Sequence, residues 1–193
     1  MGCNKKYDGV MANHSLHHVT NLEHLFNQIN NSIHTDGSFV ISDMIGRNGH
    51  QRWPESMEIV NKYWKELPES YKYNALLNRQ EAEYENWDCS KEGFEGIRAQ
   101  DILPLLMEHF KCEKFIGFGS AIDIFVDRCF GYNFNMKSEL DLEFIDRVHA
   151  EDEAGLKSGK LTPTHMIAVF AKTMRVSPFY SRGIEPISSV RRP

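Results

Sequence analysis

Two short apolar segments with one amphipathic helix between them open the chain and limit it to a small set of folds. Residues 7–12 and residues 39–45 are apolar runs of strand length. Between them, Thr20 and Glu23 have the spacing of a capping box, and apolar residues then recur at helical intervals up to Gly37. A strand, a helix and a strand in this order predict a parallel β-α-β unit with a right-handed crossover, and therefore an α/β fold.

The segment that follows differs from its neighbours in composition. Residues 46–96 contain all three tryptophans and several tyrosines among many charged residues. We expect a helical insertion here. It forms either a lid over a ligand, because Trp and Tyr offer flat apolar surface with a polar atom, or an ordinary helical core.

The second half of the chain predicts two helices and three strands. Asp101 caps one helix, with Pro104 in its first turn, and Ser138 opens another with an acidic residue at capping distance. The strands are expected over residues 113–118, 121–126 and 165–171. Residues 1–173 then form one domain, and residues 174–193 form a C-terminal tail that is an arm or disordered.

Charge and cysteine content exclude several classes of function. The 27 acidic and 22 basic residues are mixed along the chain, so no basic stripe predicts nucleic-acid binding. No apolar run reaches the roughly 18–20 residues that a membrane-spanning helix needs. The cysteines lack C-x-x-C spacing and are Cys3, Cys89, Cys112 and Cys129. We expect a cytoplasmic protein with reduced thiols that binds a small molecule or a protein, and neither nucleic acid nor a membrane.

The first β-α-β unit has a distinctive sequence, YDGVMANHSLHHVTNLEHLFNQINNSIHTDGSFVISDMIG. It contains an N-x-x-L-H-H loop after the first strand and an aspartate at the end of the second, and EGIRAQDILPLLMEHF and THMIAVFAK follow later in the chain. This ordered set, over residues 6–172, resembles strands four to seven of class I S-adenosylmethionine-dependent methyltransferases of the small-molecule type. The resemblance implies a partial Rossmann-like methyltransferase sheet with a helical insertion.

The same resemblance implies a missing part. In that family three strands come first, and the turn after the first strand carries a glycine-rich loop that lets the backbone approach the cofactor. Residues 1–6 have no room for them, so the chain is similar to the C-terminal half alone. It is a fragment, or it has lost cofactor binding, or another chain supplies the first half. Because the family's fourth strand lies beside its first, residues 7–12 become an unpaired edge, which predicts a homodimer or higher oligomer.

The resemblance also assigns a catalytic base and a cofactor loop. Leu16-His17-His18-Val19 is similar to the L-H-D-W context of the catalytic histidine in plant-type O-methyltransferases, so His17 is the expected base. The alternative is that His17 only packs at a strand-to-helix turn. The residues expected to line the methionine and sulfonium side of S-adenosylmethionine are Asn13, His14, Ser15 and Leu16, and their alternative is an ordinary loop.

The acceptor side is expected near the end of the second strand. Asp43 orients a hydroxyl or amine of the small-molecule acceptor, or else it caps a turn before Gly46. Arg98 reaches the acceptor pocket, or it pairs with Glu95 or Asp101. The full set of expected acceptor-binding residues is His18, Asp43, Met44, Trp53 and Arg98.

No metal site is expected, because the histidines of this region match no standard ligand spacing and acidic residues near them are few; they are His14, His17, His18 and His24. The function expected from the resemblance is methyl transfer from S-adenosylmethionine to a small-molecule acceptor, with O-methylation favoured. The alternative is a noncatalytic binding or dimerisation module that keeps half of the fold.

Overall fold

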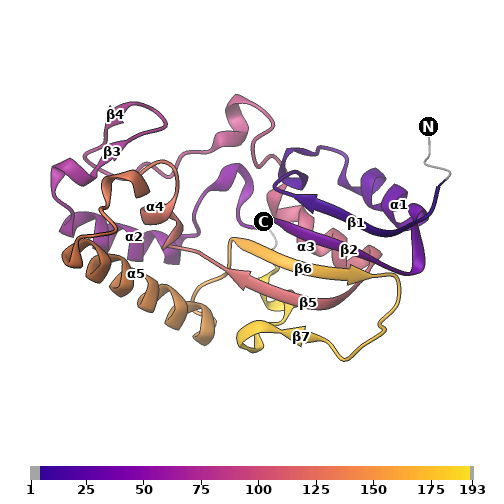
Figure 1. The fold of residues 1–193 in the computed structure, drawn as a ribbon. Coiled ribbons are helices and arrows are strands. Elements are labelled where there is room, and N and C mark those ends of the chain that lie inside the picture. Colours follow the sequence, from indigo (N-terminus) through magenta and orange to yellow (C-terminus); the bar gives the residue numbers. More distant parts are fainter. Residues whose placement is uncertain (1–4, 192–193) are drawn as a thin grey trace. The chain divides into compact units, whose positions relative to one another are not determined.

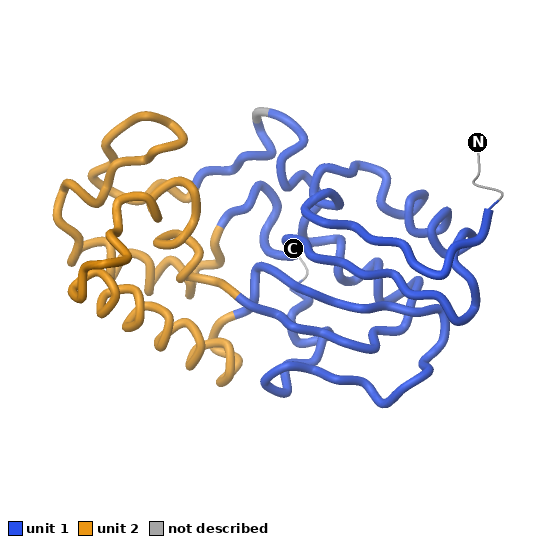
Figure 2. Tube along the Cα trace, viewed as in Figure 1, with its two compact units in different colours: residues 1–51, 87–118, 162–193 blue, residues 52–86, 119–161 orange. Residues whose placement is uncertain are grey.

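The computed structural model describes residues 5–191 and divides into two compact units (Figure 2). Unit 1 comprises residues 1–51, 87–118 and 162–193, and unit 2 comprises residues 52–86 and 119–161. Each unit therefore joins segments that are distant in the sequence. The predicted division into residues 1–173 and a tail is a different one and stays a prediction.

Unit 1 is built on one mixed sheet, in which the strands are ordered β1-β2-β6-β5-β7 (Figure 1). β1 and β2 are parallel, as predicted, whereas β6 is antiparallel to both β2 and β5, and β7 is parallel to β5. The α/β class is confirmed. The strands are β1 (Tyr7–Asn13), β2 (Ile33–Met44), β5 (Lys111–Phe118), β6 (His165–Ala171) and β7 (Phe179–Tyr180).

One face of this sheet is covered by α1 (Leu22–Ser32) and α3 (Ala99–His109). Alternate residues of a strand point to the same face, and the buried β2 residues follow this period. The Phe39 ring packs against those of Phe26 and Phe110, with centroids 6.3 and 5.7 Å away. Asp43 lies on the same face of β2 as Phe39, so its carboxylate is buried along with the apolar side chains of that face.

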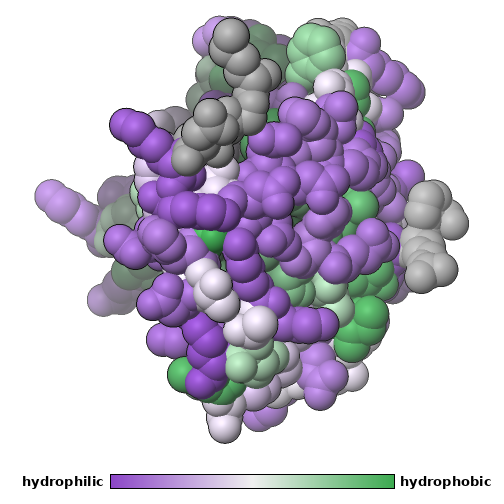
Figure 3. Space-filling view, turned by 90° about the vertical axis from the view of Figure 1, so that its right-hand side faces the viewer, coloured by the Kyte–Doolittle hydropathy of each residue, from purple (hydrophilic) through white to green (hydrophobic). Residues whose placement is uncertain are grey.

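The opposite face of the sheet is more open. Met11 and Val40 are partners across β1 and β2, and Met11 is 75 % exposed. Only Ala12 of β1 is buried, although residues 7–12 form an apolar run, because β1 is an edge strand paired with β2 alone among the described residues. On the face of the molecule shown in Figure 3, hydrophilic side chains dominate and hydrophobic ones form small separate groups.

The two helices of unit 1 begin at different residues from those predicted. Asn21, rather than Thr20, caps α1, and its side chain accepts a hydrogen bond from the His24 N–H at 3.0 Å. In α3, Arg98 is the N-cap residue. Pro104 therefore lies inside the helix rather than in its first turn, where it removes one backbone hydrogen bond.

Residues 121–126 were expected to be a strand and are not. They contain the short helix α4 (Asp123–Val126) in unit 2. The amides of Ala121 and Ile122 donate to Oδ1 of Asp152, at 2.7 and 3.3 Å. A buried carboxylate from another helix satisfies these amides in place of a neighbouring strand, and the local apolar pattern does not reveal this.

Unit 2 packs two helices around an aromatic cluster. The Tyr63 and Phe144 rings meet edge to face at 5.7 Å, and Phe125 contacts both. Ser138 caps the longer helix, as predicted. The elements of this unit other than α4 are α2 (Pro54–Glu66), α5 (Glu139–Ser158), β3 (Tyr73–Asn74) and β4 (Arg79–Gln80), the last two forming a small antiparallel pair.

Residues 52–86, which include α2, form an excursion of the chain whose two ends meet. The Arg52 N–H donates to the Asn86 side chain at 2.7 Å, and the Asn86 amide donates back to the Arg52 carbonyl at 3.1 Å. The ends of this excursion of the chain are thus fastened together by one amide side chain.

The C-terminal segment is neither a free arm nor disordered over its described residues. It adds β7 to the sheet, and Arg182 donates to the Gly117 carbonyl at 3.0 Å. Arg191 donates to Thr162 at 2.9 Å. Single turns of 3-10 helix complete the chain at Leu16–His18, Asn48–His50, Glu69–Tyr71, Cys89–Glu92, Gly131–Asn133, Ser181–Gly183 and Pro186–Ser189.

Two further findings bear on the expected class of protein. Within residues 5–191, no helix combines the length and the apolar character needed to cross a membrane. Cys89, Cys112 and Cys129 are free thiols, and Cys3 lies outside the described residues.

Candidate functional site

The candidate site lies where β1 and β2 end. Because the two strands are parallel, their carboxyl ends meet at the same edge of the sheet, which is where ligands bind in open α/β sheets. The loop of residues 14–18 follows β1, and Asp43 and Met44 end β2. Except for Trp53 and Arg98, the predicted site residues lie at the ends of these two strands or in the loop after β1, and the structure brings them together.

Asp43 organises this edge. Its Oδ2 accepts hydrogen bonds from the Ser15 and Leu16 amides, both at 2.8 Å, and its Oδ1 accepts one from the Met44 amide at 2.8 Å. The same Oδ1 lies 2.5 Å from Nδ1 of His17. Burial acts to raise the pKa of Asp43, but the hydrogen bonds from His17, Leu16 and Ser15 outweigh it, and the pKa is lowered.

His17 is held in one orientation by this contact. It is only 4 % exposed and lies in a single 3-10 turn after β1. An ionised Asp43 can only accept hydrogen bonds, so Nδ1 of His17 carries a hydrogen, and in the neutral ring Nε2 is an acceptor. The structure therefore directs the basic nitrogen of His17 away from Asp43.

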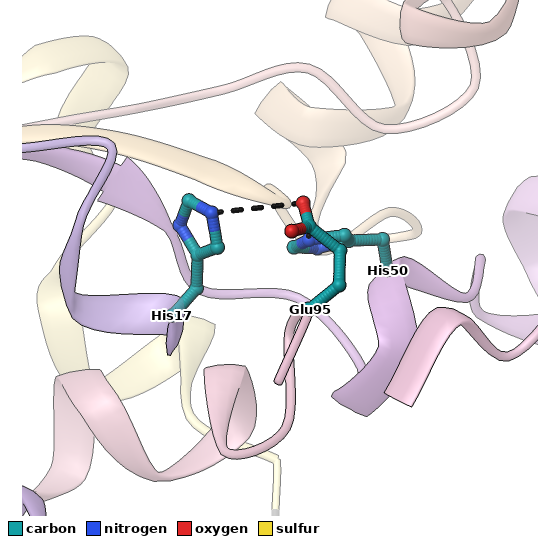
Figure 4. A group of neighbouring side chains, drawn as sticks. All are labelled: His17, His50 and Glu95. Atoms are coloured by element: carbon teal, nitrogen blue, oxygen red, sulfur yellow. Dashed lines mark hydrogen bonds and ion pairs between the residues drawn. The ribbon is translucent and has the colours of Figure 1, made fainter. Parts of the chain in front are cut away.

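Nε2 of His17 faces a group that the sequence did not predict (Figure 4). Glu95 Oε1 lies 3.8 Å from it, and the same oxygen lies 3.1 Å from Nε2 of His50. The other Glu95 oxygen is 3.3 Å from Nδ1 of His18. The His17 ring centroid is 4.1 Å from that of His18 and 5.1 Å from that of His50. Three histidines thus surround one carboxylate.

Two glycines bring His50 and Glu95 together. The Gly49 N–H donates to the Gly96 carbonyl at 2.9 Å, and both glycines have positive φ, 66° and 65°. A Cβ on Gly49 would lie 1.9 Å from Oδ1 of Asp88, and one on Gly96 would lie 2.9 Å from the His50 ring. Glycine is therefore required at both positions, and this pair of glycines is the signal in the sequence that could have indicated the contact.

The predicted cofactor loop is partly exposed and partly core. Asn13, His14 and Ser15 are exposed, and His14 has a positive φ of 43° while its N–H donates to the Ser42 carbonyl at 2.8 Å. Leu16 is only 2 % exposed and packs in the hydrophobic core of unit 1. Of the four, the first three are open to solvent, whereas the Leu16 side chain anchors the loop to the core.

The remaining predicted acceptor residues have separate surroundings. The Arg98 guanidinium binds both carboxylate oxygens of Glu23 at 2.7 Å and one oxygen of Asp101 at 2.7 Å, and these hydrogen bonds raise its pKa. Its alternative as the partner of Asp101 is thus present in the structure. Trp53 belongs to unit 2, at the N-cap of α2, and Met44 is half-buried at the end of β2.

The arrangement can accept a proton at Nε2 of His17 or hold a cation. Among the described residues, the ligand atoms of His17, His50 and Glu95 all lie within 4.8 Å of one another. A scan against protein-family models gives no match, and a search among curated proteins gives no significant match.

Proposed function

We propose that this chain carries the acceptor side of an S-adenosylmethionine-dependent small-molecule methyltransferase, and that His17 is the general base for a hydroxyl acceptor. The observation that carries the proposal is the buried pair of Asp43 and His17 at the carboxyl ends of two parallel strands. A carboxylate that holds one nitrogen of an imidazole fixes the tautomer and stabilises the imidazolium that forms when the other nitrogen takes a proton.

The polar loop after β1 fits the amino-acid part of the cofactor. Asn13, His14 and Ser15 offer exposed donors and acceptors at the strand end, which suits a ligand with an ammonium and a carboxylate. When bound, S-adenosylmethionine supplies a methyl group whose carbon–sulfur bond breaks as the new carbon–oxygen bond forms. Nε2 of His17 takes the proton of the acceptor hydroxyl, and Asp43 stabilises the charged ring.

The sheet supports a Rossmann-like methyltransferase half as the finer description of the fold. With residues 121–126 set aside, the four strands expected from the sequence are all strands of one sheet, as β1, β2, β5 and β6. α1 joins the parallel pair.

A noncatalytic binding or dimerisation module is the second candidate function. The observation that favours it is the open edge of β1, where Met11 is largely exposed. Under this proposal, Asp43 and His17 only hold the loop after β1 in place.

Methyl transfer from labelled S-adenosylmethionine to a panel of small phenols and alcohols separates the two candidates. The chain, on its own or with a chain that supplies the first half of the fold, should transfer label, and His17→Gln should lower the rate by roughly 10²–10⁴-fold. The control is His24→Gln, an exposed histidine on α1, which should not change the rate.

Calorimetric titration of S-adenosylhomocysteine into the same proteins provides the second readout. Binding that His17→Gln leaves intact, together with the loss of rate, supports a base. An unchanged rate in His17→Gln would overturn the assignment of His17, and no label transfer with any acceptor would favour the noncatalytic module.

A further inference from the structure

We propose that His17, His50 and Glu95 form a binding site for a divalent transition-metal ion of the zinc class. Two imidazoles and one carboxylate are a common set of protein ligands for zinc, and a site with three protein ligands keeps a fourth position open. The three residues come from two stretches of unit 1, residues 1–51 and 87–118, and Figure 4 shows the Glu95 carboxylate beside the His17 and His50 rings.

The separations of the ligand atoms are close to those that such an ion needs. With bonds of about 2.0–2.1 Å, tetrahedral ligand atoms lie roughly 3.3 Å apart. Glu95 Oε1 is 3.1 Å from Nε2 of His50 and 3.8 Å from Nε2 of His17. All the ligand atoms lie within 4.8 Å of one another and Glu95 is partly exposed, so modest side-chain rotations would bring them to the spacing of a bound ion.

Asp43 provides the outer support that metal-binding histidines usually have. It holds Nδ1 of His17 at 2.5 Å and is itself fixed by the amides of Ser15, Leu16 and Met44. A carboxylate on the far nitrogen sets the ring orientation and leaves Nε2 as an electron-pair donor toward the ion. This arrangement distinguishes the cluster from three titratable side chains that merely lie close together.

His18 lies beside the three ligand residues. Its Nδ1 is 3.3 Å from Glu95 Oε2, and its side chain is half exposed. His18 is thus a neighbour of the three ligands, and a water or an oxygen of a small molecule can complete the coordination. A bound ion occupies the electron pair on Nε2 of His17. A protein molecule that holds zinc therefore cannot use this nitrogen as a base, and zinc should inhibit methyl transfer. The zinc site itself does not depend on the proposed function.

Zinc binding is tested by competition with a chromophoric chelator, using the untagged 193-residue chain freed of metal. One equivalent should bind. His50→Ala and Glu95→Gln should weaken binding at least as much as Asp43→Asn, for which the loss of an outer-shell partner predicts roughly 10–100-fold. His24→Ala and Glu58→Gln, both at exposed helix positions, are the matched controls and should bind zinc like the unaltered chain.

Cobalt in place of zinc gives a readout that does not depend on affinity. The visible absorption of bound Co²⁺ should change in position and intensity in His50→Ala and Glu95→Gln, while circular dichroism verifies that these variants are folded. The inference is overturned if the chain takes up no zinc, or if the two ligand variants bind it as tightly as the controls. Titration of S-adenosylhomocysteine into metal-free protein is independent of both results, so the zinc site and the proposed function can fail separately.

Discussion

Asp152 is a buried carboxylate that should make the stability of the protein depend on pH. It is 1 % exposed, and its Oδ1 accepts the amides of Ala121 and Ile122, whereas its Oδ2 has no hydrogen-bond partner within residues 5–191. Burial, with the nearby charge of Asp123, raises its pKa to about 6. When the pKa of a carboxyl is higher in the folded state than in the unfolded state, the free energy of unfolding of the protein decreases as the pH rises through these two pKa values. The loss should fall between about pH 4 and pH 6.

Asp152→Asn should remove this loss. The amide keeps an oxygen that accepts the two backbone N–H groups but carries no charge, so the free energy of unfolding at pH 8 should rise by about 1–3 kcal/mol. Urea denaturation at pH 4 and pH 8 measures the effect, and the gain should be smaller at pH 4. A variant that is less stable than the unaltered chain at pH 8 would contradict the assignment.

The residues of the candidate site were predictable only in part. His17 and Asp43 stand at the ends of two predicted strands, and the parallel pairing of those strands brings them together. His50 and Glu95 were missed as site residues because their contact depends on two irregular segments that meet through Gly49 and Gly96. No periodicity predicts such a meeting.

At the scale of single elements, the cap of α5 provides a direct test of local stability. The Ser138 side chain accepts a hydrogen bond from the Asp141 N–H at 3.3 Å and donates to the Asp141 carboxylate at 3.1 Å. Ser138→Ala should lower the free energy of unfolding by about 1 kcal/mol, because a helix N–H loses its partner. Ser138→Thr keeps a hydroxyl that can both accept from the Asp141 N–H and donate to its carboxylate, so it should recover most of the loss of stability, as thermal unfolding would show. Equal loss in both variants would contradict a capping role.

The elements that the sequence predicted well are those with strong periodicity or a clear cap. β6 covers residues 165–171 as predicted, and α5 begins directly after Ser138. Residues 121–126 have an equally apolar pattern but contain the short helix α4, and Asp152 from α5 accepts the amides of Ala121 and Ile122 that precede it. Local pattern cannot distinguish a strand partner from a carboxylate that arrives from elsewhere in the chain.

At the scale of the whole molecule, the open edge of β1 predicts self-association. The His14 N–H donates to the Ser42 carbonyl of β2, so by the two-residue period of a strand the backbone groups of Met11 face away from β2. We expect a dimer or larger oligomer in light scattering at micromolar concentration. Met11→Pro removes an outward N–H without breaking the ladder to β2 and should give a monomer.

Val40→Lys is the control for this prediction. Val40 lies on the open face of the sheet but not at its edge, so the charge should leave pairing along β1 intact. A monomeric mass for the unaltered chain would contradict self-association. If Met11→Pro remains oligomeric, the interface does not involve the edge of β1.

The double hydrogen bond between Arg52 and Asn86 has a consequence for how sequences of this kind can diverge. These hydrogen bonds hold the two ends of residues 52–86 together. In the sequence, His50 comes shortly before this excursion and Glu95 comes shortly after it. Insertions or deletions between these two anchor points therefore need not alter the spacing of the two site residues. Natural variation in length should gather inside the excursion, whereas the short stretches that flank it should keep a constant length.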